Sequence, residues 1–189
     1  MTPAQTPLPP LPGRGSGARR MARMLRVDHA GELAAVHIYR GQKAVLGGSP
    51  ATAGAAAGID AMAAQEAEHL AAFDALLTER GVRPSLLAPL WRAAGFTLGA
   101  ATALIGEKAA HACTEAVETV IEAHYAGQVA EISAREPELA GKLESYRQDE
   151  LAHRDKAVEE GAREAPAYPL LSAVIRAGCR AAIKVAEAV

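Results

Sequence analysis

Aromatic residues are scarce in this chain, at 4% of 189 residues, whereas half of the residues are apolar and many of those are alanine. A β-sandwich fills its core with aromatic and β-branched side chains, so this composition argues against one. Alanine-rich segments favour closely packed helices instead. We therefore expect an all-α fold with one core, which a chain of this length is large enough to bury.

Cysteine and net charge are also in short supply. The two cysteines, Cys113 and Cys179, lie far apart and form no CxxC pair, which argues against a disulfide framework and a thiolate metal site. They fit a reducing, cytosolic environment. A formal net charge of -2 provides no basic field to attract nucleic acid, so we expect no nucleic-acid partner.

Proline and glycine are concentrated in a few places that divide the chain into helical segments. Residues 1–18 hold five prolines and three glycines without an apolar signal-peptide core, so we expect a disordered tail followed by one domain over 19–189. Other loop signals lie between the helices that we predict. These helices span 20–46, 56–79, 86–106, 107–133, 138–162 and 169–187. The junction at 106–107 is either a loop or a kink.

Two of the predicted helices place a glutamate and a histidine one turn apart on an apolar stripe. The second helix carries Glu66 and His69, and the fifth carries Glu150 and His153. Apolar residues continue each stripe at alternating steps of three and four, the spacing of a buried seam in a helix bundle. Both Glu-x-x-His pairs are therefore predicted to point inward.

The first and fourth helices each bury a glutamate in the same way. These are Glu32 and Glu118, although Glu115 and Glu122 lie on nearly the same face and spacing alone prefers Glu118 only slightly. Residues equally distant from a tight turn lie level in an antiparallel hairpin. The Glu32 and Glu66 pair is centred on one predicted turn, and the Glu118 and Glu150 pair on another. The chain is therefore predicted to be a doubled hairpin with four glutamates at one level.

The four buried glutamates need a cation between them. A lone Glu-x-x-His is more often part of a solvated face, but an unpaired buried carboxylate is costly and no lysine or arginine lies on these stripes at that level. Two divalent ions would balance four carboxylates. A glutamate from each of two helices with a Glu-x-x-His from each of two others is the pattern of ferritin-like di-iron and di-manganese proteins. Mixed carboxylate and imidazole ligands suit divalent iron or manganese, and of the two we expect iron.

Four blocks of the sequence supply separate evidence. They are RVDHAGELAAVHIYRGQ (26–42), ACTEAVETVIEAHYAGQ (112–128), DELAHRD (149–155) and APAYPLLSAVIRAGCRAAI (165–183). Together they resemble the demethoxyubiquinone hydroxylase family over nearly everything after residue 20. The resemblance implies a ferritin-like antiparallel four-helix bundle with two additional helices and a di-iron site. The metal ligands that it implies are Glu32, Glu66, His69, Glu118, Glu150 and His153. The chain departs from the family pattern at Thr119 and Ala152, where a carboxylate is common.

The resemblance also implies an activity. It is the O2-dependent hydroxylation of the ring of a polyprenylated methoxy-methyl-benzoquinone or its quinol in ubiquinone biosynthesis, with NADH as electron donor. No GxGxxG motif is present to bind NADH in a Rossmann domain. The segment containing His124 and Tyr125 resembles the family segment proposed to relay electrons. A buried tyrosine with a satisfied hydroxyl is an equally good account of Tyr125.

Two helices lie outside the four-helix scheme and are expected to associate with a membrane. Residues 93–106 form an uncharged run of 14 residues, short of the roughly 20 that span a bilayer. The last helix carries Arg176, Arg180 and Lys184 at steps of four, a pattern typical of an interfacial helix, although a core helix with a solvated basic face would show it too. We expect peripheral attachment to the cytoplasmic face of the inner (cell) membrane, with the isoprenoid tail entering beside 86–106.

Two other functions agree with part of the pattern. A ferritin-like ferroxidase or iron-binding protein would use the same centre without an organic substrate. A metal-free helical membrane scaffold would use no metal at all. The sequence does not decide the length of the isoprenoid tail, the choice of quinone or quinol, or whether the chain forms a homo-oligomer or needs a substrate-presenting partner.

Overall fold

The computed structural model describes residues 16–48 and 52–188, and these residues form helices and loops without a strand. The all-α class predicted from the sequence is confirmed. The helices are α1 (Ser16–Leu46), α2 (Ala53–Glu79), α3 (Ala88–Ile105), α4 (Glu107–Ile132), α5 (Pro137–Glu159), the 3₁₀ helix η2 (Ala162–Glu164) and α6 (Tyr168–Ala188).

The helix ends lie close to the predicted ones; the start of α1 and the junction between α3 and α4 need comment. Helix α1 begins at Ser16 and so includes the end of the expected 1–18 tail; Arg20 donates hydrogen bonds of 2.9 and 2.7 Å to Glu131 on α4, which hold this end of α1 to the bundle. The rest of the tail and positions 49–51 of the first loop lie outside the described residues. Gly106 separates α3 from α4 with a φ of 146°, which favours glycine, so the junction is a break and not a kink.

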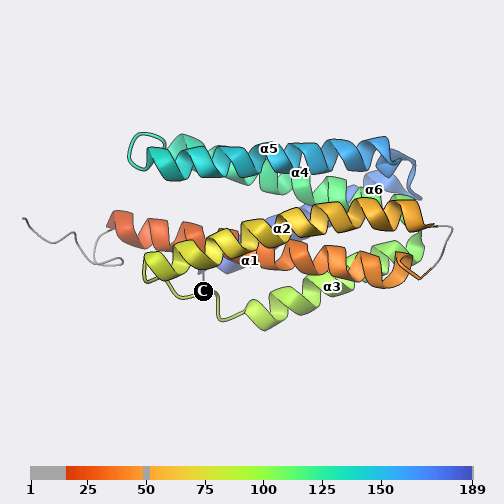
Figure 1. Ribbon diagram of the computed structural model, residues 1–189, viewed down its shortest axis with the longest axis horizontal. Coiled ribbons are helices and arrows are strands. Elements are labelled where there is room, and N and C mark those ends of the chain that lie inside the picture. Colours follow the sequence, from red (N-terminus) through yellow and green to blue (C-terminus); the bar gives the residue numbers. More distant parts are fainter. Residues whose placement is uncertain (1–15, 49–51, 189) are drawn as a thin grey trace, which may run out of the picture.

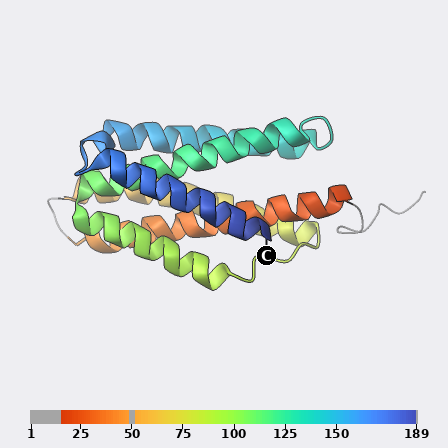
Figure 2. The same cartoon turned by 180° about the vertical axis from the view of Figure 1, so that it is seen from behind.

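Four long helices form two antiparallel hairpins that pack together (Figure 1). Helix α1 lies along α2, and α4 lies along α5. Helix α3 packs against α1, while α6 packs against α4 and α1 on the side turned away from α2 and α5 (Figure 2). The two additional helices therefore cover one side of a four-helix bundle.

Helices α1 and α3 touch backbone to backbone. A Cβ built on Gly99 would lie 2.7 Å from the carbonyl carbon of Ile38 and closer still to its oxygen, and one on Gly41 would overlap the carbonyl of Phe96. Only glycine permits this approach. The small, uncharged residues of α3 thus have a packing role that periodicity does not reveal.

Apolar clusters lie above and below the level of the glutamates. Along α2, Ile59 and Met62 belong to one cluster and Phe73 and Leu76 to another, with Glu66 between them. These layers keep the glutamates away from bulk water at both ends. None of the described helices is long and apolar enough to cross a membrane.

Candidate metal centre

The four helices of the bundle bring all six residues predicted as metal ligands together in its core. Their nitrogen and oxygen atoms form two groups, within each of which the atoms lie no more than 4.8 Å apart. The first group is Glu32, Glu66, His69 and Glu150, and the second is Glu66, Glu118, Glu150 and His153. None of the six is more than 4% exposed. Glu66 and Glu150 belong to both groups, so each would help to hold either of two ions.

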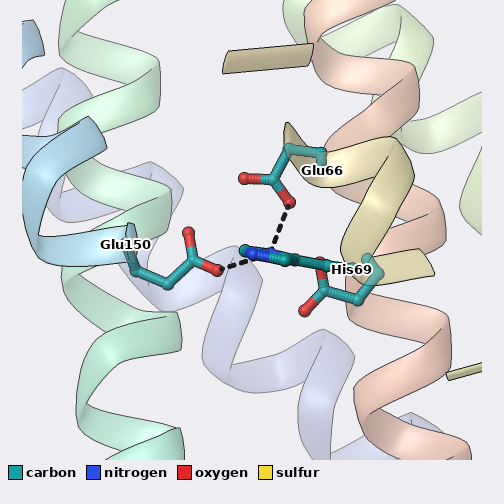
Figure 3. Close-up of side chains that lie close together, drawn as sticks. Glu66, His69 and Glu150 are labelled. Carbon is teal, nitrogen blue, oxygen red and sulfur yellow. Dashed lines mark ion pairs between the residues drawn. The ribbon is translucent and has the colours of Figure 1, made fainter. Parts of the chain in front are cut away.

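Both histidines turn Nδ1 toward the carboxylates. The Nδ1 atom of His69 lies 3.5 Å from Glu150, and the two carboxylates of Glu66 and Glu150 approach the ring from different helices (Figure 3). The Nδ1 atom of His153 lies 3.0 Å from Glu66 and 3.5 Å from Glu150. The i, i+3 spacing of each Glu-x-x-His therefore directs both side chains at one centre.

Several inward-facing atoms have no hydrogen-bond partner. They are Oε2 of Glu32, Oε1 of Glu66, both carboxylate oxygens of Glu150 and Nδ1 of both histidines. Nδ1 of His153 lies close enough to Glu66 for an ion pair, but the two groups are not oriented for a hydrogen bond. Buried polar atoms are normally paired, and unpaired oxygen and imidazole nitrogen donors around one point suit divalent iron or manganese. The residues therefore fit a pair of divalent metal ions.

The pKa shifts show how strongly the cluster favours positive charge. Burial, followed by repulsion from Glu150, raises the pKa of Glu66 and of Glu118 well above the usual value. Burial opposes protonation of His69, yet the nearby carboxylates of Glu150 and Glu32 prevail and raise its pKa to about 10. A metal cation would relieve the repulsion among these carboxylates, as a bound proton does.

The structure decides which glutamate of α4 faces the centre. Glu115 accepts a hydrogen bond from Arg176 on α6, and Glu122 accepts one from Arg147 on α5. Glu115 and Glu122 are therefore each paired with an arginine outside the centre, and Glu118 is the glutamate of α4 that faces it. Arg176, one of the three basic residues predicted along the last helix, turns toward Glu115, and its side chain is 31% exposed.

Two buried tyrosines hold the carboxylates of α1 and α4. Tyr39 donates a 2.8 Å hydrogen bond to Glu118, and Tyr125 donates one to Glu32. Sequence reasoning did not assign Tyr39, although its position seven residues after Glu32 matches that of Tyr125 after Glu118. Tyr125 has a satisfied hydroxyl, as the simpler account required, and its part in an electron relay stays a prediction.

His124 belongs to a polar network beside this tyrosine. Its Nε2 lies 3.3 Å from Oδ1 of buried Asp28, which also accepts a 2.6 Å hydrogen bond from Gln128. Burial raises the pKa of Asp28 despite these partners. Helix α1 begins at Ser16, so Asp28 lies well inside the helix and not in its first turn. His29 lies apart from this network, 3.0 Å from Asp74.

This fold and this set of side chains define the ferritin-like di-metal carboxylate class, with a glutamate from each of two helices and a Glu-x-x-His from each of the other two. Within that class, the chain belongs to the family described as "Ubiquinone biosynthesis protein COQ7", which matches residues 19–186. The family suggested by the sequence blocks is thereby confirmed.

Individual relatives agree with this assignment. The chain is 51% identical over 179 residues to the 3-demethoxyubiquinol 3-hydroxylase of Rhodospirillum rubrum, covering 95% of this chain and 83% of the relative. It is 44% identical over 169 residues to the human "NADPH-dependent 3-demethoxyubiquinone 3-hydroxylase, mitochondrial", covering 87% and 76%. A yeast relative, the mitochondrial 5-demethoxyubiquinone hydroxylase of Saccharomyces cerevisiae, is 40% identical over 185 residues, covering 87% and 76%.

Proposed function

We propose that this protein is an O2-dependent monooxygenase that hydroxylates the ring of a demethoxyubiquinol or its quinone in ubiquinone biosynthesis. The observation that carries the proposal is the buried cluster of four glutamates and two histidines with unpaired atoms facing one another. The family and the hydroxylases named among the relatives support it. A ferroxidase would share the cluster but has no use for the apolar groove described below.

We propose iron as the metal, with two ions held by the six residues of the cluster. Bound ferrous iron would supply the redox chemistry that activates O2. The residues of this chain have separate tasks. The carboxylates balance the charge of the ions, Tyr39 and Tyr125 hold Glu118 and Glu32 in place, and the apolar layers at either end exclude water.

The electrons come, in this proposal, from a reduced nicotinamide nucleotide. The family resemblance implies NADH, while relatives from mouse, cow and human are named NADPH-dependent. Oxidation of the two nucleotides by the iron-loaded protein in the presence of a short-chain substrate distinguishes them. We propose His124 and Tyr125 as the relay, because Tyr125 donates to Glu32 and His124 lies beside Asp28. Tyr125→Phe should then slow nucleotide oxidation while two irons stay bound, and an unchanged rate would remove Tyr125 from the relay.

An apolar groove offers a path for the isoprenoid tail. It is lined by residues of α1, α3, α4 and α6, including Trp91 of α3 and Ile183 of α6. Two residues of α4 contribute as well: Val117 directly precedes Glu118, and Ile121 follows it by three positions. The helix that carries Glu118 therefore lines part of the groove. We propose that the tail lies here, between α3 and α6, with the ring toward the metals.

Exposed apolar side chains on two of the helices that line the groove, α3 and α6, support peripheral attachment to the cytoplasmic face of a membrane. On α3 they include Leu104 and Ile105, which are 75% and 55% exposed, and on α6 they include Leu170 and Val174. Arg180 and Lys184 on α6 would contact anionic headgroups. The protein would then take its substrate directly from the bilayer.

Flotation with anionic liposomes tests the membrane proposal. Wild type should rise with the vesicles, and Leu104→Glu with Ile105→Glu should stay behind while keeping its iron. Ala61→Glu with Ala75→Glu adds the same charge at exposed positions of α2 and serves as the control. If both double variants float like wild type, α3 does not contact the membrane.

The hydroxylase assignment is tested in cells and with purified protein. Lipid extracts of cells lacking the gene should accumulate a quinone short of one methoxy group, which wild type but not Glu150→Ala should clear. Normal ubiquinone in the deletion strain would refute the assignment. Iron oxidation without ring hydroxylation by the purified protein would favour a ferroxidase, and a protein that stays metal-free after anaerobic iron loading would favour the scaffold.

A further inference from the structure

The two histidines of the cluster are held from outside by residues of each other's motif. Nε2 of His69 lies 3.1 Å from Oδ2 of Asp149, and Nε2 of His153 lies 3.0 Å from Oε1 of Gln65. Asp149 directly precedes Glu150, and Gln65 directly precedes Glu66. Helices α2 and α5 therefore exchange equivalent contacts, each supplying the acceptor for the other's imidazole.

Helices α1 and α4 exchange contacts in the same way. Each helix carries a tyrosine seven residues after its glutamate, and this tyrosine bonds the glutamate of the other helix. Each also carries a glutamine ten residues after its glutamate, and this glutamine bonds the residue four positions before the other helix's glutamate. The bonds are Tyr39 to Glu118, Tyr125 to Glu32, Gln42 to Thr114, and Gln128 to Asp28. The site thus has an approximate two-fold arrangement of contacts.

The charges do not follow this two-fold arrangement. The first group, which contains Glu32 and His69, has Asp149 behind its histidine and Asp28 four residues before its glutamate. The second group, which contains Glu118 and His153, has neutral Gln65 and Thr114 in the equivalent places. Both additional carboxylates therefore lie on the same side of the centre.

This difference changes the metal-facing nitrogen. A carboxylate that accepts a hydrogen bond from the outer N–H of a histidine makes the inner nitrogen a more basic ligand, and an amide oxygen does so less. We propose that the two metal positions are inequivalent, so that the position of Glu32 and His69 binds a divalent ion more tightly and fills before the position of Glu118 and His153. The inference rests on the two-metal centre of the proposed function and assigns Asp149 as a positioning residue.

Equilibrium titration of the purified full chain with Co²⁺ tests this order. Wild type should bind two ions in two resolved steps, and crystals grown with one equivalent should show anomalous density at the position of Glu32 and His69. Asp149→Asn keeps the shape of the side chain but removes its charge, and should weaken the tighter step by about 10- to 100-fold, as is typical for partners of metal-binding histidines. Asp155→Asn, the same change at an exposed position of α5, should leave both steps unchanged.

The opposite substitution separates positioning from loss of structure. Gln65→Glu should tighten the weaker step, and the double variant Gln65→Glu with Asp149→Asn should place the first ion at the position of Glu118 and His153. Two steps of equal affinity in wild type, or an Asp149→Asn titration that matches that of Asp155→Asn, would overturn the inference and leave the di-metal hydroxylase standing. A wild-type chain that binds no metal, or only one ion at saturation, would overturn both.

Discussion

Replacing Gly99 by alanine tests the close packing of α3 on α1, which positions one wall of the proposed substrate groove. A Cβ at this position would lie 2.7 Å from the carbonyl carbon and 3.0 Å from the Cα of Ile38, and ordinary contact begins at 3.4 Å. The neighbouring atoms belong to the backbone of a long helix and cannot rotate away as a side chain would. The two helices must therefore separate by at least 0.7 Å.

The expected cost follows from two opposing effects. Overpacking of a well-packed interface destabilises by about 1–3 kcal/mol, and a backbone contact belongs at the upper end of that range. Alanine in place of glycine stabilises a helix interior by up to about 1 kcal/mol. We expect a net loss of about 2 kcal/mol, which for a chain of this size lowers the Tm by about 4–8 °C.

Thermal unfolding followed by circular dichroism measures this loss. Gly141→Ala on α5 is the matched control, because a Cβ there meets no atom within 4 Å and only the gain in helix propensity remains. Its Tm should equal or exceed that of wild type. If Gly99→Ala is as stable as Gly141→Ala, the two backbones are not in contact and the reasoning about α3 is wrong.

Three other predictions concern the centre and the contacts around it. His153→Ala should abolish hydroxylation and the binding of the second metal ion while far-ultraviolet circular dichroism stays like that of wild type; a wild-type rate would mean that His153 is not a ligand. Arg176→Met leaves buried Glu115 without its cation and should lower the free energy of unfolding by about 2 kcal/mol, less than a fully buried pair because Arg176 is partly exposed. Arg180→Met, one turn further along α6, should change the free energy of unfolding little. Equal losses in the two variants would contradict the pairing of Arg176 with Glu115. Burial lowers the pKa of His111 below 6.5, so the unfolded chain takes up this proton at a higher pH than the folded one. Wild type should therefore lose stability relative to His111→Gln as the pH falls from 7 to 5, measured by urea titration. A difference in unfolding free energy that stays constant over this pH range would refute the prediction.

Much of the fold and of the candidate site follows from local sequence signals. The six helices were predictable because apolar residues repeat at steps of three and four and because glycine and proline interrupt them. Glu66, His69, Glu150 and His153 were predictable for a related reason, since a polar residue on an apolar stripe must point into the bundle. The equal distances of the glutamates from their turns then placed them at one level.

Other features depend on how helices distant in the sequence are placed against one another. Periodicity could not choose Glu118 over Glu115, because the choice rests on Arg176 of α6 reaching Glu115. It could not show that Asp149 bonds His69 across the bundle, since a residue next to a seam glutamate has the same local pattern whether it faces solvent or a neighbouring helix. The sequence by itself thus determined which residues turn inward, because that depends on the helical repeat. Only the tertiary structure decided which inward residues pair, because a hydrogen bond depends on distances of a few ångströms between helices.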